Sequence, residues 1–174
     1  MELIKKIVLL NLFFILGCGS QIKPRIEPEN NVTGFKVTAT LSDINDAAVE
    51  VPEISTKPRI FIFASTFCGI CQAEHRNLRD LMSINNDILP NNIEFYTIMT
   101  GSADNADSLD FKDFTKIQWN PFYQIGDELR NSLCGKGTAN PCVIIEKPNQ
   151  GIVFKHFGEV SIAELQSYTG VWTW

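Results

Sequence analysis

The sequence of 174 residues lacks several features that would each indicate a particular class of protein. It holds no block of lysine and arginine, and its formal net charge is −5, so the basic surface typical of nucleic-acid-binding proteins is missing. No repeat or low-complexity tract interrupts it. It has only two histidines, which leaves few nitrogen ligands for a metal ion. What remains, at 44% hydrophobic and 20% charged, is the composition of one globular domain.

The first twenty residues have the layout of a secretory signal. Lys5 and Lys6 precede a largely apolar stretch at positions 7–16, and small residues follow it. This stretch is too short to cross a bilayer, which takes about 20 apolar residues. A buried N-terminal helix or strand is the alternative interpretation.

The segment ILGC, which ends at Cys18, resembles a bacterial lipobox, in which cleavage leaves the cysteine as the lipid-bearing N-terminus. We therefore expect residues 1–17 to be a lipoprotein signal peptide and residues 18–34 to be the lipidated cysteine with a flexible polar tether. Gly19 stands where an aspartate would favour retention in the inner membrane, so we predict a periplasmic protein anchored to the outer membrane. A plain cleaved signal that leaves Cys18 free is the alternative.

Hydrophobic spacing predicts alternating strands and helices through the expected globular domain, residues 35–174. Nearly continuous apolar runs indicate buried strands, and spacings of three and four indicate helices. Ser161 and Glu164 form a capping box, which marks the start of a helix. In chain order the expected elements are a hairpin (35–41 and 47–53), a strand (59–65), a helix from Cys68 that ends before Pro90, a strand (93–99), a helix (107–117), a short helix (127–133), a hairpin (142–157) and a helix (162–168).

This order predicts an α/β fold with a mixed central sheet, flanking helices and an N-terminal β-hairpin. In the helix at 107–117, we expect Leu109, Phe114 and Ile117 to form the buried face. The helix that follows Cys68 has its own expected inner face, made of Cys71, Leu78, Leu81, Met82, Asn85 and Ile88.

Cys68 and Cys71 stand where the strand at 59–65 passes into the following helix. At a helix N-terminus, unpaired amide N–H groups and the positive end of the helix dipole favour a thiolate. Cys68 is therefore the expected attacking thiol, with a lowered pKa. Cys71, one turn later, is placed to resolve a mixed disulfide by attacking Cys68. A CxxC at this position predicts thiol-disulfide exchange.

The segment FIFASTFCGICQAEHRNL resembles the active-site segment of the thioredoxin superfamily, in particular the membrane-tethered TlpA-like thiol-disulfide oxidoreductases of the bacterial periplasm. The similarity covers about residues 35–168 and includes Glu74, three residues after the second cysteine. It implies a thioredoxin-like fold, protein thiols or disulfides as substrates, a further redox partner that recharges the couple, and no cofactor.

The segment TANPCVIIEKPNQGIV is similar to the family's segment around the cis-proline. By this similarity Pro141 would face the CxxC, and the backbone of Asn140 would pair with an extended substrate. Phe67 would cover the first cysteine in place of the usual tryptophan. A trans proline that opens an edge strand is the alternative for Pro141. The sequence departs from the family at Ile62, where some relatives have a buried acid, and at Arg76, where a helix-kinking proline is common.

Cys134 and Cys142 lie outside this motif, between the end of a helix and the strand after Pro141. A disulfide between them is possible if their Cα atoms lie within about 7 Å. Because the predicted compartment is oxidising, we favour a structural disulfide. A second redox pair that feeds the first, or two free thiols, are the alternatives.

Two other classes of function compete with thiol exchange. A copper-delivery module of the same fold would use both CxxC cysteines and either His75 or His156. We expect both histidines to be partly exposed instead, and a zinc site of four cysteines does not fit the spacing, so we predict no metal site. The third class is a tethered binding lipoprotein whose CxxC forms an inert disulfide.

Overall fold

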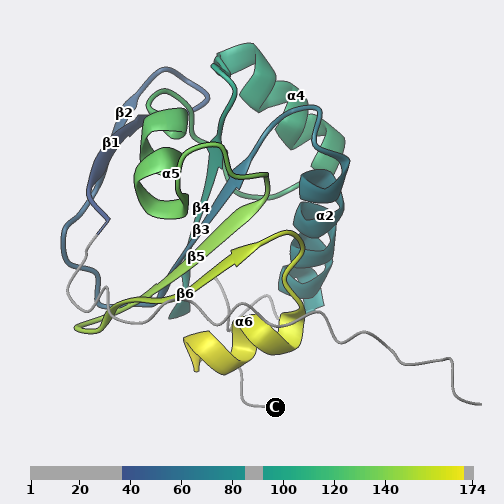
Figure 1. Ribbon diagram of the computed structural model, residues 1–174. Helices are drawn as coiled ribbons and strands as arrows, with labels where there is room; N and C mark the ends of the chain where they lie inside the picture. The colour runs from purple at the N-terminus through teal and green to yellow at the C-terminus, as the bar shows by residue number, and fades with distance from the viewer. Residues whose placement is uncertain (1–36, 85–91, 171–174) are drawn as a thin grey trace, which may run out of the picture.

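A computed structural model describes residues 37–84 and 92–170, and a four-stranded sheet forms the centre of this part of the chain (Figure 1). The strand order is β4-β3-β5-β6, in which β3 runs parallel to β4 and antiparallel to β5, and β5 runs antiparallel to β6. The antiparallel pair β1-β2 forms a separate two-stranded sheet. The elements are β1 (Ala39–Ser42), β2 (Ala48–Val51), β3 (Arg59–Ala64), α2 (Gly69–Ile84), β4 (Glu94–Met99), α4 (Asn105–Thr115), α5 (Gly126–Cys134), β5 (Cys142–Lys147), β6 (Gly151–Phe157) and α6 (Ile162–Thr169).

The side chains of β3 alternate between two hydrophobic layers, as the period of two in a strand requires. Phe61 and Phe63 face the layer beneath α5 and the β1-β2 hairpin, whereas Ile60 and Ile62 face the layer that α2 and α6 cover. All six residues of β3 are buried, which explains its nearly continuous apolar sequence. The expected mixed sheet, flanking helices and N-terminal hairpin are confirmed.

The buried face of helix α4 differs from the face that hydrophobic spacing predicts. Its buried residues are Ser108, Phe111 and Thr115, whereas Leu109 and Phe114 are 44% and 59% exposed. Ser108 and Thr115 are small enough to fit into a closely packed interior, so this face can be buried in spite of its lower hydrophobicity. Phe114 instead lies under the guanidinium of Arg76 on α2, at 5.4 Å from the ring centre.

Several sequence predictions lie outside the described residues. They concern the signal peptide at 1–17, the tether at 18–34 with Cys18, and the inward-facing Asn85 and Ile88. Within the residues that the structure describes, no helix has the length and apolar character needed to cross a membrane.

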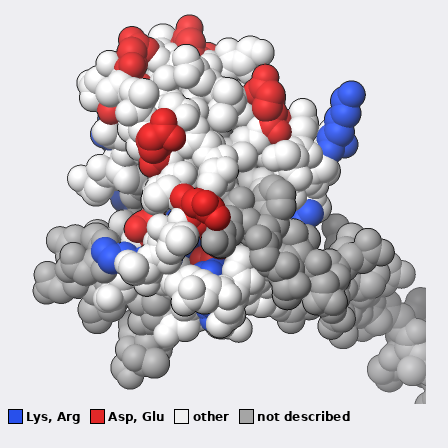
Figure 2. Space-filling view, turned by 90° about the vertical axis from the view of Figure 1, so that its left-hand side faces the viewer, with Lys and Arg blue, Asp and Glu red and all other residues white. Residues whose placement is uncertain are grey.

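The face of the molecule that carries the β1-β2 hairpin displays mainly acidic side chains (Figure 2). Asp46 and Glu50 are exposed there on the hairpin, and Glu128 is exposed on α5. A surface of this sign repels polyanions and attracts basic groups.

A buried ion pair fixes the hairpin to one end of the sheet. Arg59 and Glu146 are cross-strand partners on β3 and β5, and Nη2 of Arg59 donates to both carboxylate oxygens at 2.7 Å. The guanidinium also donates to the carbonyl oxygens of Val37 and Pro52, which flank the hairpin. The Val37 N–H donates back to Glu146 at 3.5 Å. Two charges thus hold together three segments that are distant in sequence.

Removal of one partner should strongly destabilise the fold, since the other charge would stay buried without compensation. We expect Arg59→Met to lower the free energy of unfolding by about 3–5 kcal/mol, measured by urea denaturation. Lys116→Met is the matched control, because the Lys116–Asp113 side chains are 64% and 83% exposed; it should cost less than about 1 kcal/mol. Equal losses in the two variants would contradict this account of the buried pair.

Candidate active site

The two cysteines of the CxxC lie at the junction of β3 and α2 and are joined by a disulfide, with their Cα atoms 5.2 Å apart. The chain leaves β3 at Ala64, and the Cys68 N–H donates to the Ser65 carbonyl in the connecting turn. Cys68 is partly exposed, whereas Cys71 is fully buried. One sulfur is therefore open to a partner molecule and the other is shielded by the protein.

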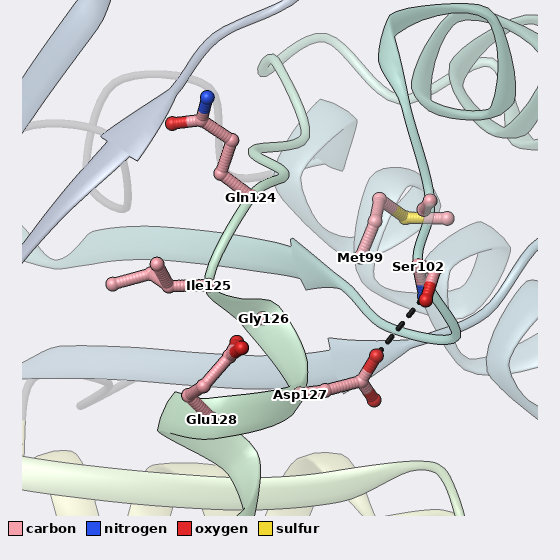
Figure 3. A pocket seen from close by; sticks show the side chains of 8 residues that line it. Met99, Ser102, Gln124, Ile125, Gly126, Asp127 and Glu128 are labelled. Carbon is pink, nitrogen blue, oxygen red and sulfur yellow. Dashed lines mark hydrogen bonds between the residues drawn. The ribbon is translucent and has the colours of Figure 1, made fainter.

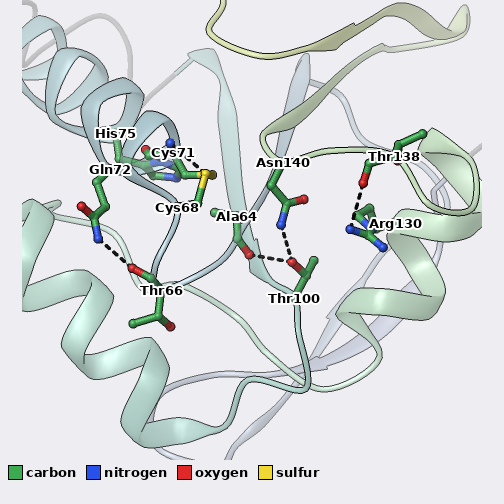
Figure 4. The surroundings of a disulfide bond; sticks show 10 residues. All are labelled: Ala64, Thr66, Cys68, Cys71, Gln72, His75, Thr100, Arg130, Thr138 and Asn140. Carbon is green, nitrogen blue, oxygen red and sulfur yellow. Dashed lines mark hydrogen bonds between the residues drawn. A yellow bond between two sulfur atoms is a disulfide. The ribbon is translucent and has the colours of Figure 1, made fainter.

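The first turn of α2 directs a hydrogen-bond donor at the outer sulfur (Figure 4). The backbone N–H of Cys71 donates to Sγ of Cys68 at 3.2 Å. Gln72 secures the preceding turn, because its side-chain amide donates to the Thr66 carbonyl at 2.7 Å. An amide donor and the positive end of the helix dipole both stabilise a thiolate, so after reduction the favoured site of negative charge is Cys68.

The loop that contains Pro141 is bonded to the same end of β3. The peptide bond between Asn140 and Pro141 is cis. The Asn140 side-chain amide donates to Oγ1 of Thr100 at 2.7 Å, and the Thr100 hydroxyl donates to the Ala64 carbonyl at 3.0 Å. These two bonds bring Asn140 beside the cysteine pair (Figure 4).

An exposed apolar surface surrounds the outer cysteine. Phe67, directly before Cys68, is 93% exposed, and Ile70, directly before Cys71, is 54% exposed. Covering these exposed apolar side chains with a partner molecule would be favourable, because it removes apolar surface from water.

Glu74 is a buried acid on the inner face of α2, only 2% exposed. Its Oε1 accepts from the Val160 N–H at 3.3 Å, and its Oε2 has no hydrogen-bond partner among the described residues. Burial raises the pKa of Glu74 to about 8. The side chain is consequently a neutral acid at neutral pH.

His75 is fully buried, so the expectation of a partly exposed helix residue was wrong. Its Nδ1 lies 2.7 Å from the Cys71 carbonyl oxygen, and its Nε2 lies 2.9 Å from Oγ1 of Thr97. Burial lowers the pKa of His75 to about 4. Hydrogen bonds engage both ring nitrogens, which leaves neither nitrogen open to a metal ion.

His156 lies on β6, partly exposed as expected, with its ring stacked on Phe154 at 5.9 Å. In the described part of the chain, no three residues of the types His, Cys, Asp and Glu are grouped so as to hold a metal ion.

Cys134 and Cys142 form a second disulfide, with Cα atoms 6.5 Å apart, within the limit set from the sequence. It joins the last residue of α5 to the first residue of β5 and so closes the loop that carries Asn140 and Pro141. Both cysteines are buried, at 4% and 0% exposure, in the layer under the hairpin. This burial distinguishes the pair from the CxxC, in which Cys68 is partly exposed and Cys71 is buried.

A shallow pocket lies beside this end of the sheet, between the end of β4 and the start of α5 (Figure 3). Asp127 closes one side of it, since its carboxylate accepts from the backbone N–H groups of Gly101 and Ser102 at 2.9 and 3.0 Å. Met99 lines the pocket and also packs in the same buried cluster as Cys71.

Three further residues organise this site through hydrogen bonds, and no motif in the sequence marks them. Thr97 and Thr100 sit within or just after an apolar strand, and Trp119 follows α4 at a position without a helical pattern. A threonine within an apolar strand does indicate a hydrogen bond, because a buried hydroxyl needs a partner. The partners, however, come from α2, β3 and the cis-proline loop, which only the fold brings together.

Neither family models nor curated proteins gave a match to this sequence. Solved structures do match it. The thioredoxin domain of a thiol-disulfide oxidoreductase from Bacteroides vulgatus is 19% identical with a TM-score of 0.63, over 80% of this chain and 99% of that one. A secreted Mycobacterium tuberculosis disulfide oxidoreductase homologous to E. coli DsbE is 16% identical with a TM-score of 0.60, over 77% of this chain and 96% of that one.

StoA from Bacillus subtilis is also similar, at 15% identity and a TM-score of 0.59, over 78% of this chain and 98% of that one. At such identities the agreement concerns the fold. The architecture of the sheet, the cysteine pair at the start of α2 and these neighbours together show that the chain has a thioredoxin-like fold.

Proposed function

We propose that this protein is a thiol-disulfide oxidoreductase that exchanges disulfides with protein substrates through Cys68 and Cys71. The observation that carries the proposal is the asymmetry of the pair at a helix N-terminus: a partly exposed sulfur receives an N–H bond, and its partner is buried. The neighbours in fold are described as thiol-disulfide oxidoreductases, which supports the same chemistry.

In the reducing direction, the Cys68 thiolate attacks one sulfur of a client disulfide and forms a mixed disulfide, while the other client sulfur leaves as a thiolate. Cys71, deprotonated in turn, then attacks Sγ of Cys68. The Cys68–Cys71 bond forms, the bond from Cys68 to the client breaks, and the second client thiolate leaves and takes up a proton. The client gains two electrons, and the protein pair is oxidised to a disulfide. The reverse sequence oxidises a client dithiol.

Phe67, Asn140 and Pro141 are the residues that we propose to contact the client. The exposed ring of Phe67 offers apolar area beside the attacking sulfur. The side chain of Asn140 is already bonded to Thr100, so its backbone is held in place for an extended segment. The exchange needs no cofactor, but it requires a second redox partner that recharges the pair.

We further propose that the exchange takes place outside the cytoplasm, in the manner of TlpA-like proteins. The signal-like segment at 1–17 and the lipobox-like segment ending at Cys18 support a periplasmic lipoprotein, with the outer membrane favoured over the inner. One neighbour in fold is described as secreted, which agrees with this location.

The two alternatives have weaker support. Copper delivery would need a histidine ligand near the cysteines, and both nitrogens of His75 are already bonded to Cys71 and Thr97. An inert CxxC disulfide in a binding lipoprotein would have a reduction potential below about −300 mV. The reduction potentials of reductant and oxidant couples lie near −270 and −120 mV. A measured potential above −300 mV therefore favours exchange.

Substrate trapping tests the proposed function directly. In Cys71→Ser the resolving step is blocked, so we expect mixed disulfides at Cys68 to accumulate and to appear as adducts on non-reducing gels. The double variant Cys68→Ser/Cys71→Ser is the control. Capture of no more protein by the single variant than by the double variant would refute thiol exchange as the main role.

For Cys134 and Cys142 we propose a structural role. Replacing both by serine should lower the free energy of unfolding by about 2–3 kcal/mol, as the entropy model gives for so short a loop, and leave the potential of the CxxC unchanged. Urea denaturation and redox titration measure these two quantities. Undiminished stability together with slower recharging of Cys68–Cys71 would instead identify a second redox pair.

The raised pKa of Glu74 makes a prediction about stability and pH. The unfolded chain loses this proton near the ordinary glutamate pKa of 4.5, whereas the folded protein keeps it to about pH 8. The contribution of Glu74 is therefore full below pH 4.5 and declines as the pH rises to about 8. In Glu74→Gln this decline should be smaller by about 5 kcal/mol, at 1.36 kcal/mol per pKa unit over the shift of Glu74.

Urea denaturation between pH 4.5 and 9 measures the decline. Glu128→Gln is the matched control, because Glu128 is exposed on α5 and should leave the wild-type profile unchanged. Identical profiles for Glu74→Gln and wild type would contradict a proton held by the folded state.

A further inference from the structure

Behind the cysteine pair, a chain of hydrogen bonds runs through buried polar groups. Nε1 of Trp119 donates to Oγ1 of Thr97 at 2.8 Å, and the same oxygen lies 2.9 Å from Nε2 of His75. Nδ1 of His75 lies 2.7 Å from the carbonyl oxygen of Cys71. The chain therefore joins the segment after α4, the middle of β4 and the first turn of α2.

The chemistry of the end groups allows only one direction for the protons in this chain. The Cys71 carbonyl can only accept, so Nδ1 of His75 carries a proton. In a neutral imidazole Nε2 is then the acceptor, and the Thr97 hydroxyl must donate to it. The indole of Trp119 can only donate, so it completes the bonding of the Thr97 oxygen. Each group thereby determines the orientation of the next.

The surroundings of His75 hold its ring in this orientation. Phe111 of α4 contacts it edge to face, with ring centres 4.9 Å apart at 88°, and the Trp119 ring lies 6.2 Å away. Thr97 is fully buried, as is His75, so water does not compete for the bonds. A threonine and a histidine buried at this depth would be costly unless their bonds were made.

We propose that His75 is a positioning residue for Cys71, held by Thr97 and Trp119, and that its bond to the Cys71 carbonyl fixes the backbone from which the resolving thiol attacks. This inference rests on the proposed thiol exchange and concerns its second step. When the Cys68–Cys71 bond is broken, the disulfide no longer restrains Cys71. The hydrogen bond from His75 to the Cys71 carbonyl then keeps the Cys71 thiol within reach of Cys68.

The two steps can be followed separately with an aromatic disulfide, 5,5′-dithiobis(2-nitrobenzoic acid). Attack by Cys68 releases one coloured thiolate and leaves a mixed disulfide, and attack by Cys71 on Cys68 releases the second as the protein disulfide forms. The full chain carries Cys18→Ser and is purified in detergent. It is reduced until two thiols per molecule, those of Cys68 and Cys71, are titrated, and it is then mixed with one equivalent of the reagent by stopped flow. The second phase is intramolecular, so its rate is independent of reagent concentration.

We expect His75→Phe to slow the second phase about tenfold or more and to leave the first within about twofold, since small misplacements of a reacting group cost rate at this scale. Asparagine and glutamine provide a matched pair with the same amide. The His75→Asn amide nitrogen takes the place of Nδ1 and should largely restore the second phase. The His75→Gln amide reaches the place of Nε2 and should not.

Thr97→Val provides an independent variant in case changes at His75 prevent folding. It removes the donor to Nε2 and should slow the second phase selectively. Thr169→Val is its control, because Thr169 is a buried threonine on α6 whose hydroxyl donates to the Leu165 carbonyl of its own helix. This control should keep wild-type rates in both phases.

Three results would overturn the inference: an unchanged second phase in the folded variants, equal slowing of both phases, or slow resolution in His75→Asn as in His75→Phe. If the His75 variants do not fold, an unaltered second phase in Thr97→Val overturns it. Failure of the proposed function is distinguishable, because the wild type would then release no second equivalent. A wild type with two phases and variants that match it refutes only the role of His75.

Discussion

The junction between β3 and the first turn of α2 is the constraint on which the rest of this structure depends. β3 is buried along its whole length and pairs with β4 on one side and β5 on the other, so the sheet determines where the chain enters the helix. The helix then begins with one sulfur at the surface and the other in the core. Because amide N–H groups at a helix N-terminus have no partners within the helix, one of them is available to the outer sulfur.

Buried polar groups on β3, β5 and α2 are stabilised in three different ways. Arg59 and Glu146 form an ion pair in which each compensates the other. Glu74 has one oxygen to which no described residue donates, and it retains its proton at neutral pH. His75 is neutral and has both nitrogens bonded. Each solution lowers the cost of removing a polar group from water. Only the last two lie on the helix that carries the cysteines, so substitutions there are the ones expected to alter its chemistry.

Much of the fold was predictable from local patterns in the sequence. The apolar run of β3, the capping box of Ser161 and Glu164, and the turn between β5 and β6 report interactions between residues close in the chain. The cysteine pair at the strand–helix junction was likewise visible, since the position of a CxxC after a strand is a local property. The inner face of α4 was not, because hydrophobicity alone assigned Leu109 and Phe114 to it, whereas close packing selected Ser108 and Thr115.

The sequence by itself therefore determined the order of the elements and which two thiols stand at the start of a helix. The tertiary structure decided which polar side chains surround them. Thr97, Trp119 and Asn140 acquire their roles from partners that lie 22 or 40 positions away along the chain. The burial of Glu74 and His75 likewise depends on elements that pack over α2. Hydrogen bonds and desolvation act over a few ångströms in space, so a pattern of spacing along one helix contains no information about them.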